Sequence, residues 1–369
     1  MILVKNSEHE LKNYLKRVKN KKVFILSGKK SFFLSGANKL FNKNDIKSFK
    51  FYFKKEKYPK IEELEKIILS IKKIKPEIIF AIGGGSVIDY AKIANNLNNL
   101  STLKKNIINS KKKYNKIAKL IAIPTTAGSG AEVTSNAVIY INGIKYSVEG
   151  EGLIPDNFFL IPRLILKNKR QLKSSAGFDV ISQSIESLIS KKSNAKSVVF
   201  AKKSLKLSLK NYLNFLSHPN QNNCTFMSIS ANLSGKAISI SKTTAPHAVS
   251  YPFTSHFGIN HGHAVSLTLN EFLKFNYFNL HKAKCDFDIK KRFDIIFQLT
   301  NTKSIFELDN FLQQLKFKAK LEGNFRKLNI PRQAIENKIL GEINLQRLSN
   351  NPINLTIHDI KKILFEKFY

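Results

Sequence analysis

The chain has 369 residues, 43% of them hydrophobic, which is enough for one large or two ordinary domains with buried cores. Its 62 Lys and Arg outnumber 26 Asp and Glu, but only seven of the cations are arginine and the lysines are scattered, which favours a solvated lysine coat over a nucleic-acid surface. The sequence has no apolar stretch of about 18 residues, no signal-peptide core and only two distant cysteines, so we expect a cytoplasmic protein without membrane contacts or disulfides.

Strands and helices alternate in the first half of the chain. A helix is predicted at 61–74, where apolar residues repeat at helical spacing, and a hairpin at 136–148, turning at Asn142-Gly143. Buried strands are predicted at 23–27, 49–53, 77–82 and 119–126. This order is typical of a doubly wound parallel sheet.

From about residue 165 the pattern changes to long amphipathic stretches such as 197–216, with few strand signals. We therefore predict an α/β domain over 1–165 and an all-α domain over 166–369. We find no internal repeat.

A phosphate-binding turn is predicted in AIGGGSVIDYAK, residues 81–92, where a buried strand runs through three glycines into a helix. Gly83, Gly84 and Gly85 leave room for a pyrophosphate, and the helix N-terminus offers free N–H groups. Ser86 and Asp89 have the spacing of a capping pair that fixes the helix start. A tight turn without a ligand is the alternative interpretation.

Residues 123–139, IPTTAGSGAEVTSNAVI, form a Gly-rich loop after another buried strand. The hydroxyls of Thr125, Thr126 and Ser129 lie where an open α/β sheet binds its ligand. By itself this segment also fits a plain connection.

One carboxylate and two imidazoles indicate a metal site. His247 and His261 flank a segment broken by Pro252 and Gly258, and Asp179 lies upstream in AGFDVISQSIES. We expect His247 to end one helical segment, 251–260 to loop out, and His261 to begin the next helix. The alternative is a set of polar residues satisfied inside a helical domain.

Taken together, these segments resemble the iron-containing (group III) alcohol dehydrogenase family. GGGSVIDYAK is similar to the family's GGGSxxDxAK, PTTAGSGAEVT to PTTAGTGSEVT, AGFDVISQSIES to AGxDALxHAxEA, and HAVSYPFTSHFGINHGHAV to HxxxHPxxxxxxxPHGxA. NNPINLTIHDI also resembles the family's NPRxxTxxDI tail. The resemblance implies a dehydroquinate synthase-like two-domain architecture, often dimeric, with a metal in the cleft between the domains.

The resemblance also implies an enzyme that uses NAD(P)H and a divalent metal, Fe²⁺ or Zn²⁺, to reduce an aldehyde to a primary alcohol. The metal ligands implied are Asp179, His247 and His261. The cofactor-binding residues implied are Gly83, Gly84, Gly85, Ser86, Asp89, Thr125, Thr126, Ser129 and Lys145.

The chain departs from the family pattern at three places. Gln183 stands where most members have a histidine ligand, so we expect a three-ligand site. Tyr251 replaces the second histidine of the HxxxHP motif. The candidate catalytic residues are then Tyr251 and His256, and the proton relay can run through Tyr251, metal-bound water or the cofactor ribose. After the first strand, the family often has an acidic residue that hydrogen-bonds the adenosine ribose and excludes a 2′-phosphate. This chain has Ser27-Gly28-Lys29-Lys30 there, so we expect it to accept NADPH.

KTTAPHAVSYPFTSHFGINHGHAVSLTL, residues 242–269, looks most like the phosphonoacetaldehyde reductase branch, also called hydroxyethylphosphonate dehydrogenases. The substrate expected is therefore phosphonoacetaldehyde, which is reduced to 2-hydroxyethylphosphonate. Candidate substrate contacts are Gln183, Lys242, Thr243 and Thr244, because an anionic group wants ammonium and hydroxyl donors. Lys242 can equally be a surface lysine.

Three alternatives stay open. The nearest is a dehydrogenase of the same family acting on another alcohol, polyol or sugar acid. A sugar-phosphate cyclase of the same fold would use its nicotinamide transiently, although Asp179 argues against a glutamate-based metal motif. The third alternative, a basic nucleic-acid-binding protein, would lose binding as salt rises.

Overall fold

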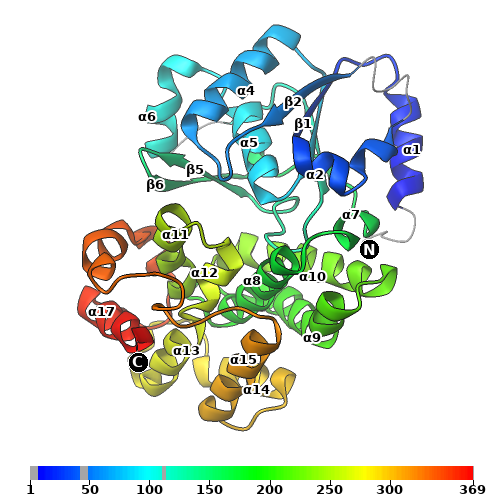
Figure 1. Ribbon diagram of the computed structural model, residues 1–369. Helices are drawn as coiled ribbons and strands as arrows, with labels where there is room; N and C mark the ends of the chain where they lie inside the picture. The colour runs from blue at the N-terminus through cyan, green and yellow to red at the C-terminus, as the bar shows by residue number, and fades with distance from the viewer. Residues whose placement is uncertain (1–6, 42–48, 110–113, 369) are drawn as a thin grey trace. The chain divides into compact units, whose positions relative to one another are not determined.

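The computed structural model describes residues 7–41, 49–109 and 114–368, which form two compact units (Figure 1). Unit 1 contains the described residues up to Asn168 together with Asn220–Gly235. Unit 2 contains Lys169–Pro219 and the described chain from Lys236 onward. Within the described ranges, no helix has both the length and the apolar character that crossing a membrane requires.

Unit 1 is built on a five-stranded sheet in the order β2-β1-β3-β4-β7, in which every neighbouring pair is parallel. The strands predicted at 23–27, 49–53, 77–82 and 119–126 are confirmed to within two residues. A separate antiparallel hairpin turns at Asn142 and Gly143, which have φ of 51° and 81°, so the predicted turn is confirmed as well. The strands are β1 (Val23–Gly28), β2 (Lys50–Lys54), β3 (Ile78–Gly83), β4 (Lys119–Pro124), β5 (Asn136–Ile141), β6 (Ile144–Glu149) and β7 (Asn157–Phe158).

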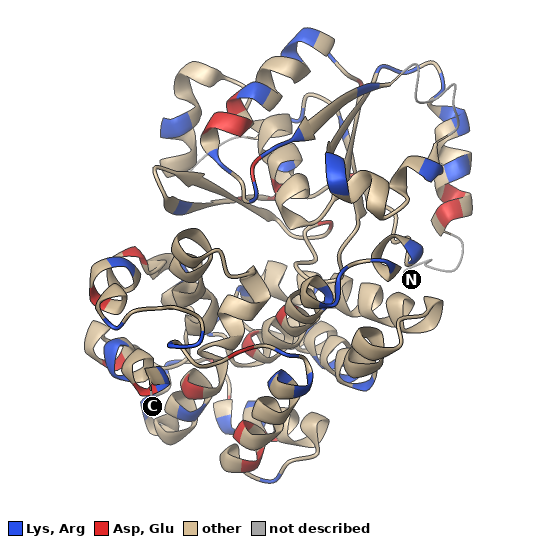
Figure 2. Cartoon of the chain, viewed as in Figure 1, with Lys and Arg blue, Asp and Glu red and all other residues tan. Residues whose placement is uncertain are grey.

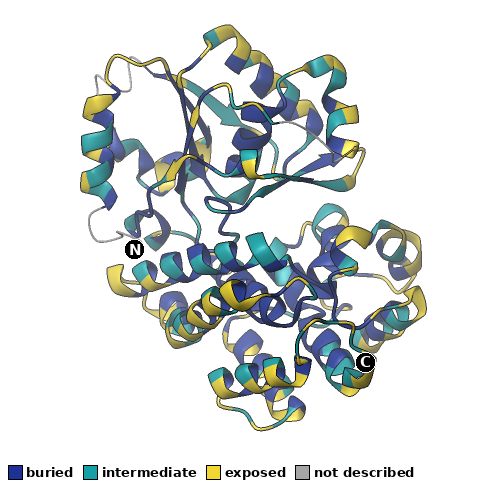
Figure 3. Cartoon of the chain, turned by 180° about the vertical axis from the view of Figure 1, so that it is seen from behind, coloured by how far each residue is buried: buried dark blue, intermediate teal, exposed yellow. Residues whose placement is uncertain are grey.

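Helices cover both faces of this sheet because its strands are apolar on both sides. In β1, Phe24 and Leu26 join one buried cluster, with Leu64 of α4, whereas Ile25 joins the other, with Leu11 of α1. Figure 3 shows the central strands β1, β3 and β4 buried between helical layers. The prediction of a doubly wound sheet is confirmed. The helices are α1 (Ser7–Arg17), α2 (Lys29–Leu34), α4 (Ile61–Ile74), α5 (Gly85–Asn96), α6 (Leu103–Ile108) and α7 (Arg163–Leu166).

Helix α10 (Gln221–Ser241) returns its first part to unit 1 through a close backbone contact. A Cβ atom on Gly130 would lie 2.5 Å from the carbonyl oxygen of Ala231 and 2.5 Å from Cα of Gly235. Beside this contact, Nδ2 of Asn232 donates to Oε1 of the buried Glu132 at 2.9 Å. The loop after β4 is therefore held against a helix that lies about 100 residues later in the sequence.

Unit 2 is helical and is organised around α8, whose residues are almost all buried from Lys173 onward. Helix α8 packs against α9, α12 and α14. Small side chains allow the close packing, and Oγ of Ser184 donates to Oγ of Ser204 on α9 at 2.9 Å. The predicted fold class, an α/β domain followed by a helical domain, is confirmed, whereas the bounds 1–165 and 166–369 stay a prediction. The helices are α8 (Arg170–Ile189), α9 (Ala195–Ser217), α11 (Ala245–Phe257), α12 (His261–Ser266), α13 (Leu269–Phe278), α14 (Ile289–Thr300), α15 (Ile305–Lys318), α16 (Leu345–Leu348) and α17 (Ile357–Phe365).

The segment between the two candidate histidine ligands differs from our expectation. Helix α11 does not end at His247 but starts two residues before it and runs through Pro252 to Phe257. Proline removes the bond to the carbonyl of residue i−4, here Ala248, and the backbone N–H of Asn344 donates to that carbonyl instead, at 3.2 Å. The helix ends at Gly258, with φ of 65°, and His261 begins α12 as predicted.

Candidate functional site

Asp179, His247 and His261 come together in unit 2, although they lie on three different helices. One carboxylate oxygen and two imidazole nitrogens lie within 4.8 Å of one another. Oδ1 of Asp179 and Nε2 of His247 are 3.2 Å apart, and both side chains are nearly buried. The ring centroids of His247 and His261 are 5.3 Å apart.

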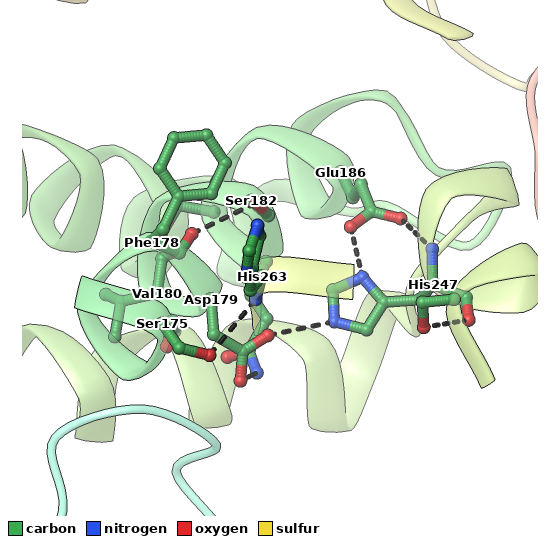
Figure 4. A network of polar contacts seen from close by, with 12 residues as sticks. Ser175, Phe178, Asp179, Val180, Ser182, Glu186, His247 and His263 are labelled. Atoms are coloured by element: carbon green, nitrogen blue, oxygen red, sulfur yellow. Dashed lines mark hydrogen bonds and ion pairs between the residues drawn. The ribbon is translucent and has the colours of Figure 1, made fainter. Parts of the chain in front are cut away.

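Glu186, seven residues after Asp179 on α8, determines how the His247 ring lies (Figure 4). Its Oε2 accepts a hydrogen bond from Nδ1 of His247. Its Oε1 accepts from the backbone N–H and the Oγ1 of Thr244, both at 2.9 Å. The other ring nitrogen, Nε2, then faces Asp179.

The charges around His247 favour a bound cation. Burial alone would lower its pKa, but the charge of Glu186, the hydrogen bonds with Asp179 and Glu186, and the charge of Asp179 outweigh burial and raise the pKa of His247 to about 9. A divalent metal could replace the proton on Nε2. The ligand atoms of a tetrahedral site lie about 3.4 Å apart, so small side-chain adjustments suffice. The three residues therefore fit a divalent metal.

The third ligand is placed by the packing of α12 on α8. Gly262 lies so close to α8 that a Cβ atom there would be 2.0 Å from the carbonyl oxygen of Ser175 and 2.7 Å from Cβ of Asp179. The backbone N–H of His263 donates to Oγ of Ser175 at 3.0 Å (Figure 4). His261, the first residue of α12, is thereby fixed beside Asp179.

Two neighbours of the cluster occupy the positions where this chain departs from the family pattern. Nε2 of Gln183 donates to Oδ2 of Asp179 at 3.2 Å, so in this orientation the amide supports a ligand. The ring of Tyr251, 6% exposed, stacks on His261 with 5.8 Å between the ring centroids. Tyr251 is therefore brought to the cluster with the three ligands.

The remaining candidates have other surroundings. His256 is exposed on the last turn of α11, and its Nε2 lies 2.9 Å from Oε1 of Glu342. Lys242 is half-buried in the turn between α10 and α11, with φ of 61°. Thr243 and Thr244 are buried, and the carbonyl of Thr243 accepts from Nδ2 of Asn350 at 3.2 Å.

In unit 1 the two glycine-rich segments meet at one edge of the sheet. Strands β3 and β4 are paired up to their ends, at Gly83 and Pro124, and the N–H of Thr125 donates to the carbonyl of Gly83 at 3.0 Å. A Cβ atom on Gly85 would lie 2.8 Å from Oγ of Ser129. The glycines thus let the two loops pack side by side, with the hydroxyls of the second loop facing the first.

The helix after this turn begins differently from our expectation. Its N-cap is Gly84, with no side-chain cap bond, so Ser86 and Asp89 do not form the predicted capping pair. Oδ2 of Asp89 instead accepts from the N–H of Val138 on β5 at 3.3 Å, and burial raises the pKa of Asp89 to about 6. Lys145 lies across the hairpin, its Nζ 6.0 Å from the ring centroid of Tyr140.

The sheet order places the end of β1 beside these loops. The chain passes from β1 to β2 on one side of β1 and then crosses to β3 on the other side. The strand order therefore reverses between β1 and β3, and open α/β sheets bind their ligands at such a point. Strand β1 ends at Gly28, and Lys29 and Lys30 are exposed immediately after it. The lysines predicted to admit a 2′-phosphate therefore follow the strand at this switch point.

Lysines and arginines are spread over the described helices of both units rather than confined to one element (Figure 2). Many lie in exposed helix positions, among them Lys72 and Lys73 of α4 and Lys202 and Lys203 of α9. This is the distribution expected of a solvated lysine coat.

Curated proteins of several activities are similar to this chain. A 1-propanol dehydrogenase of Salmonella typhimurium is 29% identical over 59% of this chain and 56% of its own length. A phosphonoacetaldehyde reductase of Streptomyces viridochromogenes is 28% identical over 56% of this chain and 55% of its own length. The chain thus spans a little over half the length of these relatives.

A solved structure supports the fold along the whole chain. The sulfoacetaldehyde reductase of Bifidobacterium kashiwanohense, crystallised in complex with NAD⁺, is 23% identical, has a TM-score of 0.85, and is matched over 98% of this chain and 95% of its own. The family model for iron-containing alcohol dehydrogenase matches residues 1–162, and the model for the C-terminal part of the Fe-containing alcohol dehydrogenase family matches residues 173–368. The chain belongs to the iron-containing alcohol dehydrogenase family.

Proposed function

We propose that this chain reduces a small aldehyde to a primary alcohol with NAD(P)H and a divalent metal. The observation that carries the proposal is the group formed by the buried Asp179 and His247 and the half-buried His261, whose ligand atoms lie within 4.8 Å of one another. One carboxylate and two imidazoles leave coordination positions open for a substrate oxygen. The ligand set suits Fe²⁺ and Zn²⁺ alike.

When bound, the metal would supply a Lewis acid and the nicotinamide a hydride, which no side chain of this chain offers. The protein's own task is to hold these groups and exclude water. Asp179 and His247 are both 4% exposed, so a charge developing there would be little screened by solvent. The glycine turn between β3 and α5 would hold the pyrophosphate of the cofactor, and the loop after β4, which contains Ser129, would hold its nicotinamide ribose.

We propose Tyr251 as the group that returns a proton to the alkoxide. It is nearly buried and stacked on His261, and its hydroxyl can donate a proton within the site. His256 is exposed and paired with Glu342, so it fits the entrance of a solvent relay better than the reacting centre. Metal-bound water and the cofactor ribose are the competing routes.

The substrate class proposed is a two-carbon aldehyde with an anionic group, with phosphonoacetaldehyde as the first candidate. Two similar proteins support it, since their names specify phosphonoacetaldehyde and sulfoacetaldehyde. Lys242, at the start of the KTTAP segment and half-buried, is the cation proposed to recognise that group. An uncharged aldehyde is the second candidate, because the similar 1-propanol dehydrogenase is 29% identical to this chain.

A steady-state assay of NAD(P)H oxidation tests this proposal. Metal-loaded protein is given phosphonoacetaldehyde, sulfoacetaldehyde or propanal, and kcat/KM is compared. We expect the anionic aldehydes to give the higher values, and Lys242→Met to raise KM for them without raising KM for propanal. Equal values for all three would remove the anionic substrate class, and no oxidation with any aldehyde would contradict the reductase activity.

A further inference from the structure

Glu186 is a buried carboxylate, and the hydrogen bonds that it accepts from described residues come from the first turn of α11 and the residue before it. It is 0% exposed. Its Oε1 accepts from the N–H and Oγ1 of Thr244, and more weakly, at 3.4 Å, from the N–H of His247. Its Oε2 accepts from Nδ1 of His247. A single side chain of α8 therefore fixes both Thr244, the N-cap of α11, and the imidazole of His247 three residues later.

These bonds determine the tautomer of the imidazole. A carboxylate can only accept, so Nδ1 of His247 must carry a proton, which leaves Nε2 as the nitrogen with a lone pair in the neutral ring. Nε2 is the atom that faces Oδ1 of Asp179, at 3.2 Å. The hydrogen bond to Glu186 thus leaves Nε2 as the only nitrogen of the His247 ring that can bind a metal in this geometry.

The charge of Glu186 has a second effect. Together with Asp179 it places two buried carboxylates beside the imidazole of His247. Two negative charges balance a divalent cation, whereas Asp179 alone would leave a net positive charge in a buried environment, which is unfavourable.

We propose that Glu186 is the positioning residue of the metal centre, and that Thr244 orients Glu186 rather than contacting the substrate. Thr244 holds Oε1 through two bonds, so that Oε2 stays aligned with Nδ1 of His247. The inference rests on the metal binding of the proposed function, but on neither its substrate nor its cofactor.

Glu186→Gln tests the inference sharply because the two side chains have nearly the same shape. A glutamine can still accept from Thr244 through its oxygen, but its NH₂ group would then face Nδ1 and donate to it. The proton of the neutral ring would move to Nε2 and block the metal. We expect metal affinity to fall by roughly 10- to 100-fold, the usual effect of losing such a partner.

The measurements are the Kd for Zn²⁺, obtained by competition with a chelator, and the visible absorption spectrum of the Co²⁺-loaded protein. Thermal unfolding of the metal-free protein controls for folding. Ser184→Ala is the matched control, since it also removes a buried hydrogen bond from α8, two residues away. It should leave both the Kd and the Co²⁺ spectrum unchanged.

Thr244 gives an independent variant that keeps the carboxylate. Thr244→Val retains the backbone N–H and loses the hydroxyl, so we expect a fall of severalfold in Zn²⁺ affinity, and Thr244→Ser should restore wild-type binding. If the Glu186→Gln and Thr244→Val proteins bind Zn²⁺ as wild type does, the positioning role is wrong. If wild-type protein itself binds no metal, the proposed function fails instead.

Discussion

The backbones of Gly130 and Gly235 touch, which joins the loop after β4 to helix α10. A Cβ atom on Gly130 would lie 2.5 Å from Cα of Gly235, and one on Gly235 would lie 2.6 Å from the carbonyl oxygen of Gly130. Gly130 belongs to the loop that also carries Ser129, one of the hydroxyls proposed to bind the cofactor. The contact therefore fixes the position of the loop that is proposed to bind the cofactor.

The first prediction follows from this contact. Gly130→Ala combines a left-handed backbone, φ of 60°, with a clash against backbone atoms that cannot rotate away. We expect a loss of about 3 kcal/mol or more in unfolding free energy, measured by urea denaturation. Gly143→Ala is the control, because its φ is 81° but no atom lies within 4 Å, so strain alone should cost about 1 kcal/mol. Equal losses in the two variants would contradict the contact.

The second prediction concerns the cofactor. Gly28→Asp places a carboxylate at the end of β1, where a Cβ atom meets only Oγ of Ser31, at 3.0 Å, and that small side chain can move. A charge about 4 Å from a 2′-phosphate costs roughly 1–4 kcal/mol. We expect the NADPH to NADH ratio of kcat/KM to fall by roughly tenfold or more, while Gly28→Asn changes it little. An unchanged ratio in the aspartate variant would place the adenosine ribose elsewhere.

The third prediction is a pH dependence of stability. Lys92 of α5 is fully buried and donates to the carbonyls of Thr134 and Asn136 and to Oγ1 of Thr134. Burial lowers the pKa of Lys92 to about 8, although the charges of Asp89 and Glu132 oppose the shift. Between that pH and the ordinary lysine value of about 10.4, the unfolded chain binds more protons, so this group makes the unfolding free energy rise with pH.

Lys92→Met removes this contribution. We therefore measure the unfolding free energy by urea denaturation at pH 8 and at pH 9.5. Between these pH values, the unfolding free energy of the variant should rise less, or fall more, than that of wild type. The same substitution at Lys104, an exposed lysine of α6, serves as the control and should leave the wild-type difference unchanged. A Lys92→Met protein whose stability follows wild type across this range would show that Lys92 does not titrate there.

The fourth prediction distinguishes the proton routes. Tyr251→Phe keeps the ring that stacks on His261 and removes the hydroxyl. If that hydroxyl returns the proton, kcat should fall by about 100-fold or more while the Zn²⁺ content stays at the wild-type value. The measurement is kcat for aldehyde reduction with metal content determined on the same sample. A kcat within twofold of wild type would assign the proton to water or the cofactor ribose.

The sequence was sufficient for the features that local patterns determine. Strands such as β3 are apolar runs ending in glycine, and the hairpin at Asn142-Gly143 has a turn with its own signature. The expectation that 251–260 loops out is wrong for 251–257, because the rule that proline ends a helix is local, whereas the bond that Asn344 gives to the Ala248 carbonyl comes from about 90 residues further on.

In the candidate site too, some features could be predicted from the sequence and others depend on how the helices pack. The ligand set could be proposed from spacing and resemblance, but the role of Glu186 could not, because it depends on which atoms of α11 meet α8. One signal was present in the sequence: Asp179 and Glu186 are the only charged residues between 174 and 190. A carboxylate in an otherwise uncharged, buried helix needs a partner. The return of residues 220–235 to unit 1 has no comparable marker.

In the function proposed for this chain, Asp179, His247 and His261 hold a metal that aldehyde reduction requires. The most direct measurement is metal content by elemental analysis, combined with NADPH oxidation by phosphonoacetaldehyde, for wild type and for Asp179→Ala after dialysis and Zn²⁺ or Fe²⁺ reloading. We predict about one metal ion per chain and aldehyde-dependent oxidation in wild type, and neither in the variant. Full metal content in the variant, or an undiminished rate in metal-free wild type, would show that these residues do not hold a metal that the reaction needs.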